Sequence, residues 1–321
     1  MKIVILDGYT INPGDLSWSG LEKYGELTVY ERTPKELILS RIGDAEIVMT
    51  SKCVLTAEIL SQCPDLNYIG ILATGINMVD LGYASSHNIL VTNIPAYSTD
   101  SVVQFTFSLL LEICNQVKAH DAAVHSGQWQ KSKDFCFSLT PQIELAGKTF
   151  GIIGYGNIGK RVSKAAEAFG MKVLIASNFP DPAFETESIT FVALDELFAA
   201  SDVISLHCPL TDSNKGFINR TAISKMKDGV ILLNTSRGPL INEEDLAQAL
   251  KSGKVFAAGL DVLSMEPPRD DNPLIGLPNC IITPHIAWIT RESRTRLIDI
   301  AVSNLKAWLG GENSNCVNQL F

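Results

Sequence analysis

Patterns that bind metals or form disulfide bonds are missing from this sequence. Its seven cysteines are an odd number, they are widely scattered, and no two of them form a Cys-x-x-Cys pair. Such spacing favours reduced thiols in the core over disulfide bonds or a zinc site, so we expect no bound metal. Histidine is scarce as well, with five in the chain, so the neighbours of each one can be considered separately.

The sequence also lacks long apolar runs and an excess of positive charge. No stretch approaches the roughly 18 apolar residues that a membrane span needs, and the apolar run after Lys2 ends at Asp7, which is too short for a signal peptide. We therefore expect a cytoplasmic protein. A net charge of −9 would repel nucleic acid and anionic lipid, which indicates a small-molecule ligand and neither a nucleic-acid nor a membrane partner.

Apolar material, by contrast, is sufficient for two domains. A length of 321 residues and a hydrophobic content of 46% suit two domains that each bury a core. Short apolar segments alternate with polar, helix-like segments in the first part of the chain, which predicts a parallel, doubly wound sheet. Its strands are expected at 2–6, 27–30, 46–50, 68–73 and 89–92.

The segment 98–127 separates this part from the rest of the chain. It opens with residues that cap helices and is then apolar at helical spacing, which predicts one long helix between two domains. The segment 128–145 carries Trp and Phe but has no clear periodicity. An arm that packs on another subunit and a loop that wraps its own subunit are both consistent with it.

A second alternating series begins at Lys148 and contains a nucleotide-binding fingerprint. A buried-type strand is followed by Gly154, Gly156 and Gly159 in G-x-G-x-x-G spacing, and then by an amphipathic helix. Gly154 allows a tight turn, Gly156 lets a pyrophosphate approach the backbone, and Gly159 lets the helix pack against the strand. A glycine turn alone is weak evidence, but with these flanking elements it predicts a dinucleotide site at the helix N-terminus. Further strands are expected at 190–192, 203–207, 230–234, 255–260 and 280–283.

The strand after the glycines has no acidic residue at its end. An acid about 20 residues past the fingerprint usually bonds the adenosine ribose of NAD, and Ser177 and Asn178 stand at this place. Neither side chain would repel the 2′-phosphate of NADP, and neither would bind it strongly. Because the next segment carries Asp181, Glu185 and Glu187 and no Lys or Arg, we expect NAD as the cofactor and leave NADP open.

Three later strands are each followed by residues with reactive chemistry. Arg237 follows one strand, Asp261 and Glu266 follow the next, and His285 follows the last. Ligands of such sheets bind beyond the carboxyl ends of the strands, so we expect these side chains to share one site. Each also has an ordinary alternative: a surface ion pair for Arg237, a solvated loop charge for Glu266 and a core histidine for His285.

Seven segments, in their order and spacing, resemble the D-isomer-specific 2-hydroxyacid dehydrogenases. The resemblance covers nearly the whole chain and points to the branch of glycerate dehydrogenases and hydroxypyruvate reductases. The segments are ATGINMVD (73–80), IPAYSTDSVVQFTFSLLLEI (94–113), ELAGKTFGIIGYGNIGKRV (144–162), LHCPLTDSNKGFIN (206–219), LLNTSRGPLINEEDL (232–246), GLDVLSMEPP (259–268) and ITPHIAW (282–288).

This resemblance implies an α/β fold with two doubly wound parallel-sheet domains. One would be a flavodoxin-like substrate-binding (catalytic) domain made of residues 1–98 and 292–321. The other would be a Rossmann NAD-binding domain made of residues 99–291, with the active-site cleft between the two. The family also suggests a homodimer.

The resemblance further implies roles in the reduction of a small 2-keto acid, such as hydroxypyruvate or glyoxylate, to the D-2-hydroxy acid, D-glycerate or glycolate. His285 would protonate the carbonyl oxygen and take the proton back in the reverse direction. Arg237 would hold the carboxylate with its planar guanidinium group. Glu266 would pair with His285, favour its charged form and orient its ring. The protein would then be an NAD(P)-dependent oxidoreductase.

The ligand contacts implied by the family come from loops. The backbone N–H groups of residues 73–77 would bind the substrate carboxylate, and Gly75 allows close approach. Lys52 could add charge there, although a solvated surface lysine is the ordinary alternative. The expected substrate contacts are Ala73, Thr74, Gly75, Ile76, Asn77, Lys52 and Trp288. The expected cofactor contacts are Gly154, Gly156, Asn157, Ile158, Gly159, Ser177, Asn178, His207, Cys208, Pro209, Thr235, Ser236, Asp261 and Ala287.

Within these sets, Asp261 matches the residue that contacts the nicotinamide carboxamide, and His207 matches one that lines the cofactor through its backbone. Trp288 stands where many relatives carry a small residue. It would narrow the pocket in favour of small substrates or else pack at the hinge between the domains.

Two other functions remain open: the same chemistry on another 2-keto acid, and a nucleotide-sensing, corepressor-like scaffold. The presence of Arg237, Glu266 and His285 argues against the scaffold. The remaining histidines lie on predicted helices without a motif partner, and we expect them to be structural or solvated: His87, His120 and His125.

Overall fold

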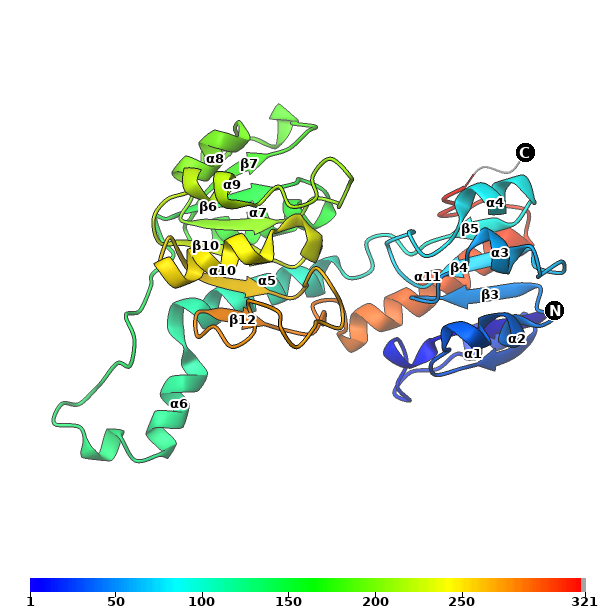
Figure 1. Cartoon of the computed structure of the whole chain (residues 1–321), viewed down its shortest axis with the longest axis horizontal. Helices are drawn as coiled ribbons and strands as arrows, with labels where there is room; N and C mark the ends of the chain where they lie inside the picture. The colour runs from blue at the N-terminus through cyan, green and yellow to red at the C-terminus, as the bar shows by residue number, and fades with distance from the viewer. Residues whose placement is uncertain (319–321) are drawn as a thin grey trace. The chain divides into compact units, whose positions relative to one another are not determined.

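The chain folds into two compact α/β units (Figure 1). In the computed structural model, which describes residues 1–318, unit 1 comprises Met1–Ser98 and the chain from Ile289 onward, and unit 2 comprises Thr99–Trp288. The sequence predicts residue 292 for the return of the chain to unit 1, and the structure places it at Ile289. Each unit is built on one parallel sheet, as the alternating apolar segments predict.

The sheet of unit 1 has five parallel strands in the order β2-β1-β3-β4-β5. The central strands are buried along their whole length because helices cover both faces of the sheet. Their bounds agree with the predicted strands to within two residues at each end: β1 Lys2–Ile5, β2 Glu26–Val29, β3 Ile47–Thr50, β4 Tyr68–Ile71 and β5 Leu90–Thr92.

Two groups of helices cover this sheet. The helices that follow β2, β3 and β4 share one apolar core with it, namely α2 Ile38–Ile42, α3 Ala57–Leu60 and α4 Leu81–Ser86. The remaining helices, α1 Ser19–Glu22 and α11 Arg291–Leu309, contact each other, and α11 also contacts β4. The ring of Trp308 on α11 lies 5.0 Å from the ring of Tyr68 on β4. Two 3-10 helices complete the unit, η1 Gly8–Thr10 and η2 Lys35–Leu37.

The sheet of unit 2 has seven parallel strands in the order β12-β11-β10-β9-β6-β7-β8. The chain runs outward from β6 in one direction and returns to β9 for the other half, which is the doubly wound arrangement. The strands are β6 Thr149–Ile153, β7 Lys172–Ala176, β8 Ile189–Phe191, β9 Val203–Leu206, β10 Val230–Asn234, β11 Val255–Leu260 and β12 Cys280–Ile282.

Separate apolar cores lie on the two faces of this sheet. One includes residues of α5 Thr99–Asn115 and α7 Asn157–Ala168, which pack against each other. The other includes residues of α8 Leu194–Ala200, α9 Arg220–Lys225 and α10 Glu243–Ser252. The 3-10 helices η4 Pro182–Phe184 and η5 Gly238–Leu240 lie in the loops after β7 and β10.

The prediction of one long helix over residues 98–127 is wrong. The segment forms two helices, α5 and α6 Val117–His125, separated by Gln116, whose φ of 45° is left-handed. A left-handed residue ends the regular i to i−4 pattern and turns the chain. Near this turn the carbonyl of Cys114 accepts a hydrogen bond from the returning chain at Ile143, with an N–O distance of 3.2 Å.

The segment after α6 forms an arm, which we define as residues 117–142. Figure 1 shows α6 and the following segment extending away from the sheet of unit 2. The arm contains the short η3 Trp129–Lys131 and exposes several apolar side chains, with Phe135 at 90%. It also exposes Cys136, so the expectation of core thiols is wrong at this position, although all seven cysteines are free. Among residues 1–318, no helix is long and apolar enough to cross a membrane.

The ion pair between Asp15 and Arg294 fastens the start of α11 within unit 1. Two guanidinium nitrogens of Arg294 each donate to one carboxylate oxygen of Asp15 at 2.7 Å, and a third bond reaches the carbonyl of Ile11 at 3.0 Å. The hydrogen bonds from Arg294 hold the pKa of Asp15 below its ordinary value of 3.8. A carboxyl group with a lowered pKa stabilises the folded state above its unfolded pKa and loses that contribution as the pH falls through the folded value.

We therefore predict that Asp15→Asn lowers the melting temperature at pH 7 and that the difference from the unsubstituted protein shrinks as the pH falls below about 4. Asp299→Asn on the exposed side of α11 is the matched control and should leave the melting temperature unchanged. Thermal unfolding followed by circular dichroism at several pH values measures both. A difference that stays constant down to pH 3 would contradict a contribution from the ionised pair.

Candidate active site

Residues with reactive chemistry follow three neighbouring strands of unit 2. Strands β10, β11 and β12 are adjacent and parallel, with Asn234 beside Leu260 and Leu260 beside Ile282. Asp261 comes directly after its aligned position, and Arg237 and His285 each come three residues after theirs. The prediction that the three residues follow successive strands at one edge of the sheet is confirmed.

His285 and Glu266 are joined by a hydrogen bond at this edge. The distance between His285 Nδ1 and Glu266 Oε2 is 2.7 Å, and the two side chains are 29% and 37% exposed. A carboxylate can only accept, so Nδ1 carries a proton and the other ring nitrogen, Nε2, is the atom that can gain or lose one. The sequence-based pairing of these two residues is therefore present, and the alternative of a buried core histidine does not apply.

The buried carboxylate of Asp261 holds the turn that carries His285. Its Oδ1 accepts from the Thr283 hydroxyl at 2.7 Å and the Ile286 N–H at 2.9 Å, and its Oδ2 accepts from the Ala287 N–H at 2.8 Å. The backbone carbonyl of Asp261 also accepts from the N–H of His285 at 2.8 Å. These bonds fasten the residues on both sides of His285 to the end of β11.

The turn needs this support because the backbone of His285 has a φ of 55°. This left-handed conformation is unfavourable for a residue with a side chain and persists where surrounding contacts impose it. Asp261 itself is 1% exposed. Burial raises the pKa of Asp261 above its ordinary value, against the hydrogen bonds from Thr283, Ala287 and Ile286 and the nearby His285, which lower it. The Asp261 carboxylate thus already accepts hydrogen bonds from groups of the protein. Its contact with a nicotinamide carboxamide stays a prediction.

The loop after β10 presents Arg237 to solvent. Asn234 is fully buried, and its side chain donates to the Arg237 carbonyl at 2.9 Å and accepts from the Ser236 N–H at 3.0 Å. The Ser236 hydroxyl donates to the carbonyl of Cys208 at 2.7 Å, which ties this loop to the one after β9. The guanidinium of Arg237 donates to the Ser236 carbonyl at 2.8 Å, and the side chain is exposed, so it can receive an anion.

The glycine fingerprint has the geometry that a dinucleotide requires. Gly154 has a φ of 97°, and an added Cβ would lie 2.7 Å from the carbonyl oxygen of His207. At Gly159 an added Cβ would lie 2.3 Å from the carbonyl oxygen of Gly154, so α7 packs directly on the turn. Gly156 is the N-cap of α7, and an added Cβ there would meet nothing within 4 Å. The open backbone at a helix N-terminus fits a pyrophosphate.

The neighbouring loops complete this face of the sheet. His207 is half-buried, its Nε2 lies 2.8 Å from the Ser205 hydroxyl, and burial lowers the pKa of His207 to about 3. It therefore stays neutral at physiological pH and exchanges no proton there. At the end of β7, the Ser177 hydroxyl accepts from the N–H of Phe179 at 3.1 Å, and Asn178 is exposed.

In unit 1 the carboxylate of Asp7 organises the loop after β3. It accepts from the N–H groups of Ser51, Lys52 and Cys53, at 2.8, 2.6 and 3.2 Å, and from the Ser51 hydroxyl at 3.1 Å. The side chain of Lys52 is exposed. This role of Asp7 was not predicted from the sequence, although an acid directly after the first predicted strand is a signal that points to the carboxyl edge of the sheet.

The loop after β4 offers donors at the same edge of the unit 1 sheet. Asn93 donates to the carbonyl of Thr74 at 2.8 Å, and the Thr74 hydroxyl donates to the carbonyl of Ile94 at 2.8 Å. Within residues 1–318, nothing accepts a hydrogen bond from the N–H of Gly75, Ile76 or Asn77. Three consecutive N–H groups without a partner are suited to bind an anion.

The other histidines have local partners. His87 follows α4, where its Nδ1 lies 3.0 Å from the carbonyl of Tyr83. On the arm, His120 contacts the Gln116 carbonyl at 2.9 Å and accepts from the N–H of Leu139 at 3.0 Å. His125 pairs with Asp121 at 3.3 Å and is 80% exposed. As expected from the sequence, these three are structural or solvated.

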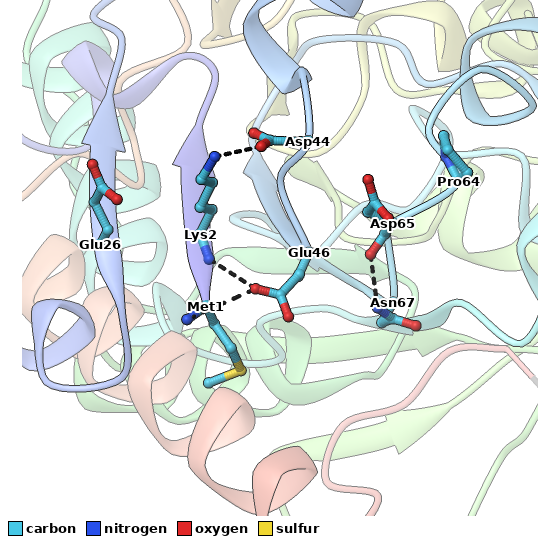
Figure 2. Close-up of a pocket in the computed structure, with 8 residues that line it drawn as sticks. All are labelled: Met1, Lys2, Glu26, Asp44, Glu46, Pro64, Asp65 and Asn67. Atoms are coloured by element: carbon cyan, nitrogen blue, oxygen red, sulfur yellow. Dashed lines mark hydrogen bonds and ion pairs between the residues drawn. The ribbon is translucent and has the colours of Figure 1, made fainter.

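A pocket in unit 1 lies at the opposite edge of its sheet. Figure 2 shows its lining, which comes from the starts of strands and the loops before them. Lys2 contacts two of its acidic residues: its ammonium group binds Asp44, and its backbone N–H donates to Glu46 at 3.0 Å. Ligands of doubly wound sheets bind at the carboxyl ends of the strands, so this pocket is separate from the loops described above.

Comparisons with known proteins agree with this geometry. Residues 107–287 match the family model described as "D-isomer specific 2-hydroxyacid dehydrogenase, NAD binding domain". A hydroxypyruvate reductase of Blautia hydrogenotrophica is 55% identical over 99% of this chain and 100% of its own. Among solved structures, an acyclic imino acid reductase with NADPH and D-Arg has a TM-score of 0.85 at 30% identity, covering 99% of this chain and 100% of that one. A D-lactate dehydrogenase of Aquifex aeolicus with NAD and lactic acid has a TM-score of 0.84 at 33% identity, covering 97% and 96%.

The bonds to Asp261 lead to a stability prediction. In Asp261→Asn, the new amide group must face either the Ala287 N–H or the Thr283 and Ile286 donors, so at least one buried donor loses its acceptor. We expect the free energy of unfolding to fall by about 1–3 kcal/mol, measured by urea denaturation. Asp271→Asn in an exposed loop is the control. Equal stability of the two variants would contradict the role of Asp261 in holding the turn.

Proposed function

Because the chain belongs to the D-isomer specific 2-hydroxyacid dehydrogenase family, we propose that it reduces hydroxypyruvate to D-glycerate with NADH or NADPH, and that glyoxylate is a second substrate. The observation that carries this proposal is the 2.7 Å contact between His285 and Glu266 at the carboxyl edge of the unit 2 sheet. The similarity to a hydroxypyruvate reductase at 55% identity supports the choice of substrate.

His285 acts as the general acid in this proposal. When bound, the reduced nicotinamide supplies the hydride to the keto carbon. His285 donates the Nε2 proton to the carbonyl oxygen as the alcohol forms, and it takes this proton back in the direction of oxidation. Glu266 holds Nδ1 and stabilises the charged ring before the proton leaves. The bonds that Asp261 makes to the turn keep His285 in the conformation that presents Nε2.

Arg237 binds the substrate carboxylate. Its guanidinium group is planar and can donate two parallel hydrogen bonds to a carboxylate, which fixes the orientation of the keto group. Exposure of the side chain and support from Asn234 are consistent with this role. For unit 1 we propose that the N–H groups of residues 75–77 and the ammonium group of Lys52 also bind the substrate.

The cofactor is held by residues of unit 2. The N-terminus of α7, with Gly156 as its N-cap, binds the pyrophosphate, and the loops after β7, β9 and β10 line the rest of the dinucleotide. The other cofactor contacts expected from the sequence stay predictions.

We also propose that the enzyme acts in the cytoplasm and that it is a homodimer. The apolar side chains of the arm, such as Phe135 at 90% exposure, support the homodimer because a second subunit would bury them.

We predict that His285→Ala lowers kcat by about 10²–10⁴-fold, the usual contribution of a general acid, while the Kd of NADH stays the same. His125→Ala is the matched control because His125 is 80% exposed on the arm. Steady-state kinetics and a fluorescence titration with NADH measure the two quantities. Turnover of the His285 variant equal to that of the control would refute the assignment.

The substrate proposal is tested with a panel of hydroxypyruvate, glyoxylate, pyruvate and a branched 2-keto acid. We expect the highest kcat/KM for hydroxypyruvate. Trp288→Ala should raise kcat/KM for the branched acid by about tenfold, because a smaller side chain leaves room for the extra methyl groups. If Trp288 instead packs at the hinge, the variant would lose activity on all four acids alike.

A further inference from the structure

Lys160 lies in the first turn of α7, beside the place where the family's cofactor binds. The helix starts at Asn157 after the N-cap Gly156. The ammonium nitrogen of Lys160 is 4.0 Å from the centre of the Phe184 ring and 5.8 Å from the centre of the Tyr155 ring. Phe184 belongs to η4, in the loop that follows β7. The side chain of Lys160 is therefore directed from the fingerprint helix towards the loop after β7.

Aromatic packing holds this arrangement in place. The Tyr155 ring meets the rings of Phe184 and Phe191 edge to face, with centroid distances of 5.7 and 5.3 Å. Phe191 is the last residue of β8, and Tyr155 stands between Gly154 and Gly156. The rings thus join the glycine turn, the loop after β7 and the edge of the sheet. The rings of Phe184 and Tyr155 attract the ammonium group of Lys160 by a cation–π interaction.

Lys160 has no anionic partner in the part of the chain that the structure describes. It forms no ion pair with any of residues 1–318. Its neighbour Arg161 binds Asp100 at 2.8 Å. Lys164 lies one turn further from the start of the helix, and Lys172 begins β7, at the opposite end of the strand from Ser177.

Two acidic side chains of the loop after β7 accept hydrogen bonds from backbone N–H groups. Asp181 accepts from the N–H of Ala183 at 3.0 Å, and Glu185 accepts from the N–H of Phe191 at 3.0 Å. At the end of β7 the Ser177 oxygen accepts from the Phe179 N–H, which leaves the hydroxyl hydrogen free to donate. The position of the usual ribose-binding acid therefore holds a donor.

We propose that Lys160 is a cofactor-specificity residue that allows the enzyme to bind NADPH about as well as NADH, by pairing its ammonium group with the 2′-phosphate. The Ser177 hydroxyl donates to the same phosphate. This inference rests on the proposed function, and it extends the sequence-based expectation, which favoured NAD, left NADP open and considered only the cations that follow Ser177 in the chain. A lysine serves this purpose because its flexible stem lets the cation stay on the rings when no phosphate is present.

The test is the binding of NADPH and NADH to the full-length protein without a keto acid, measured by fluorescence titration. We expect the two Kd values to agree within about tenfold in the unsubstituted protein. Lys160→Ala should weaken NADPH binding about tenfold and leave NADH binding within about twofold, while Lys160→Arg should retain NADPH binding. Ser177→Asp should weaken NADPH binding about 100-fold by charge repulsion.

Lys164→Ala is the matched control, since it removes an exposed lysine from the same helix. If Lys160→Ala weakens both nucleotides equally, or neither, the proposed role of Lys160 is wrong. It is also overturned if the unsubstituted protein binds NADH but binds NADPH more than about 100-fold more weakly. If neither nucleotide binds, the proposed function itself fails, and this result is distinct from the other two.

Discussion

The buried carboxylate of Asp261 is the group on which the geometry of the candidate active site depends. It stands at the end of β11 and accepts hydrogen bonds from Thr283, Ile286 and Ala287 in the turn after β12. These bonds join two neighbouring strand ends and keep His285 in a left-handed conformation that a residue with a side chain would otherwise avoid. The histidine can then point Nδ1 at Glu266 and leave Nε2 available for proton exchange.

Unit 1 uses the same physical device. Asp7 follows β1 and gathers the N–H groups of Ser51, Lys52 and Cys53 in the loop after β3. Loops that leave the carboxyl edge of a parallel sheet carry N–H groups that no strand can pair, and a single carboxylate can satisfy several of them. In both units a buried or half-buried acid therefore shapes a loop whose other side chains remain accessible to a ligand.

Much of the fold can be predicted from the sequence because the apolar pattern is strong. The strands of both sheets follow from short Ile- and Val-rich segments, and the glycine fingerprint follows from its spacing between a strand and a helix. The break at Gln116 could not be predicted, because the apolar residues on both sides of it keep helical spacing. Nothing in that pattern indicates the left-handed backbone of Gln116. Likewise, the hydrogen bond from Thr283 to Asp261 joins residues far apart in the chain, and no local pattern indicates it.

The sequence by itself determined the chemistry of this protein: an arginine, an acid and a histidine after successive strands, and a dinucleotide fingerprint. Residue types and spacing suffice for this because parallel strands end at the same edge of their sheet. Only the tertiary structure decided which groups meet. It committed the Asp261 carboxylate to the turn and brought Lys160 to the loop after β7, whereas the pairing of His285 with Glu266 is what the family resemblance already implied. These contacts depend on the distances between loops. The packing of helices and strands sets these distances, and they cannot be derived from the order of residues alone.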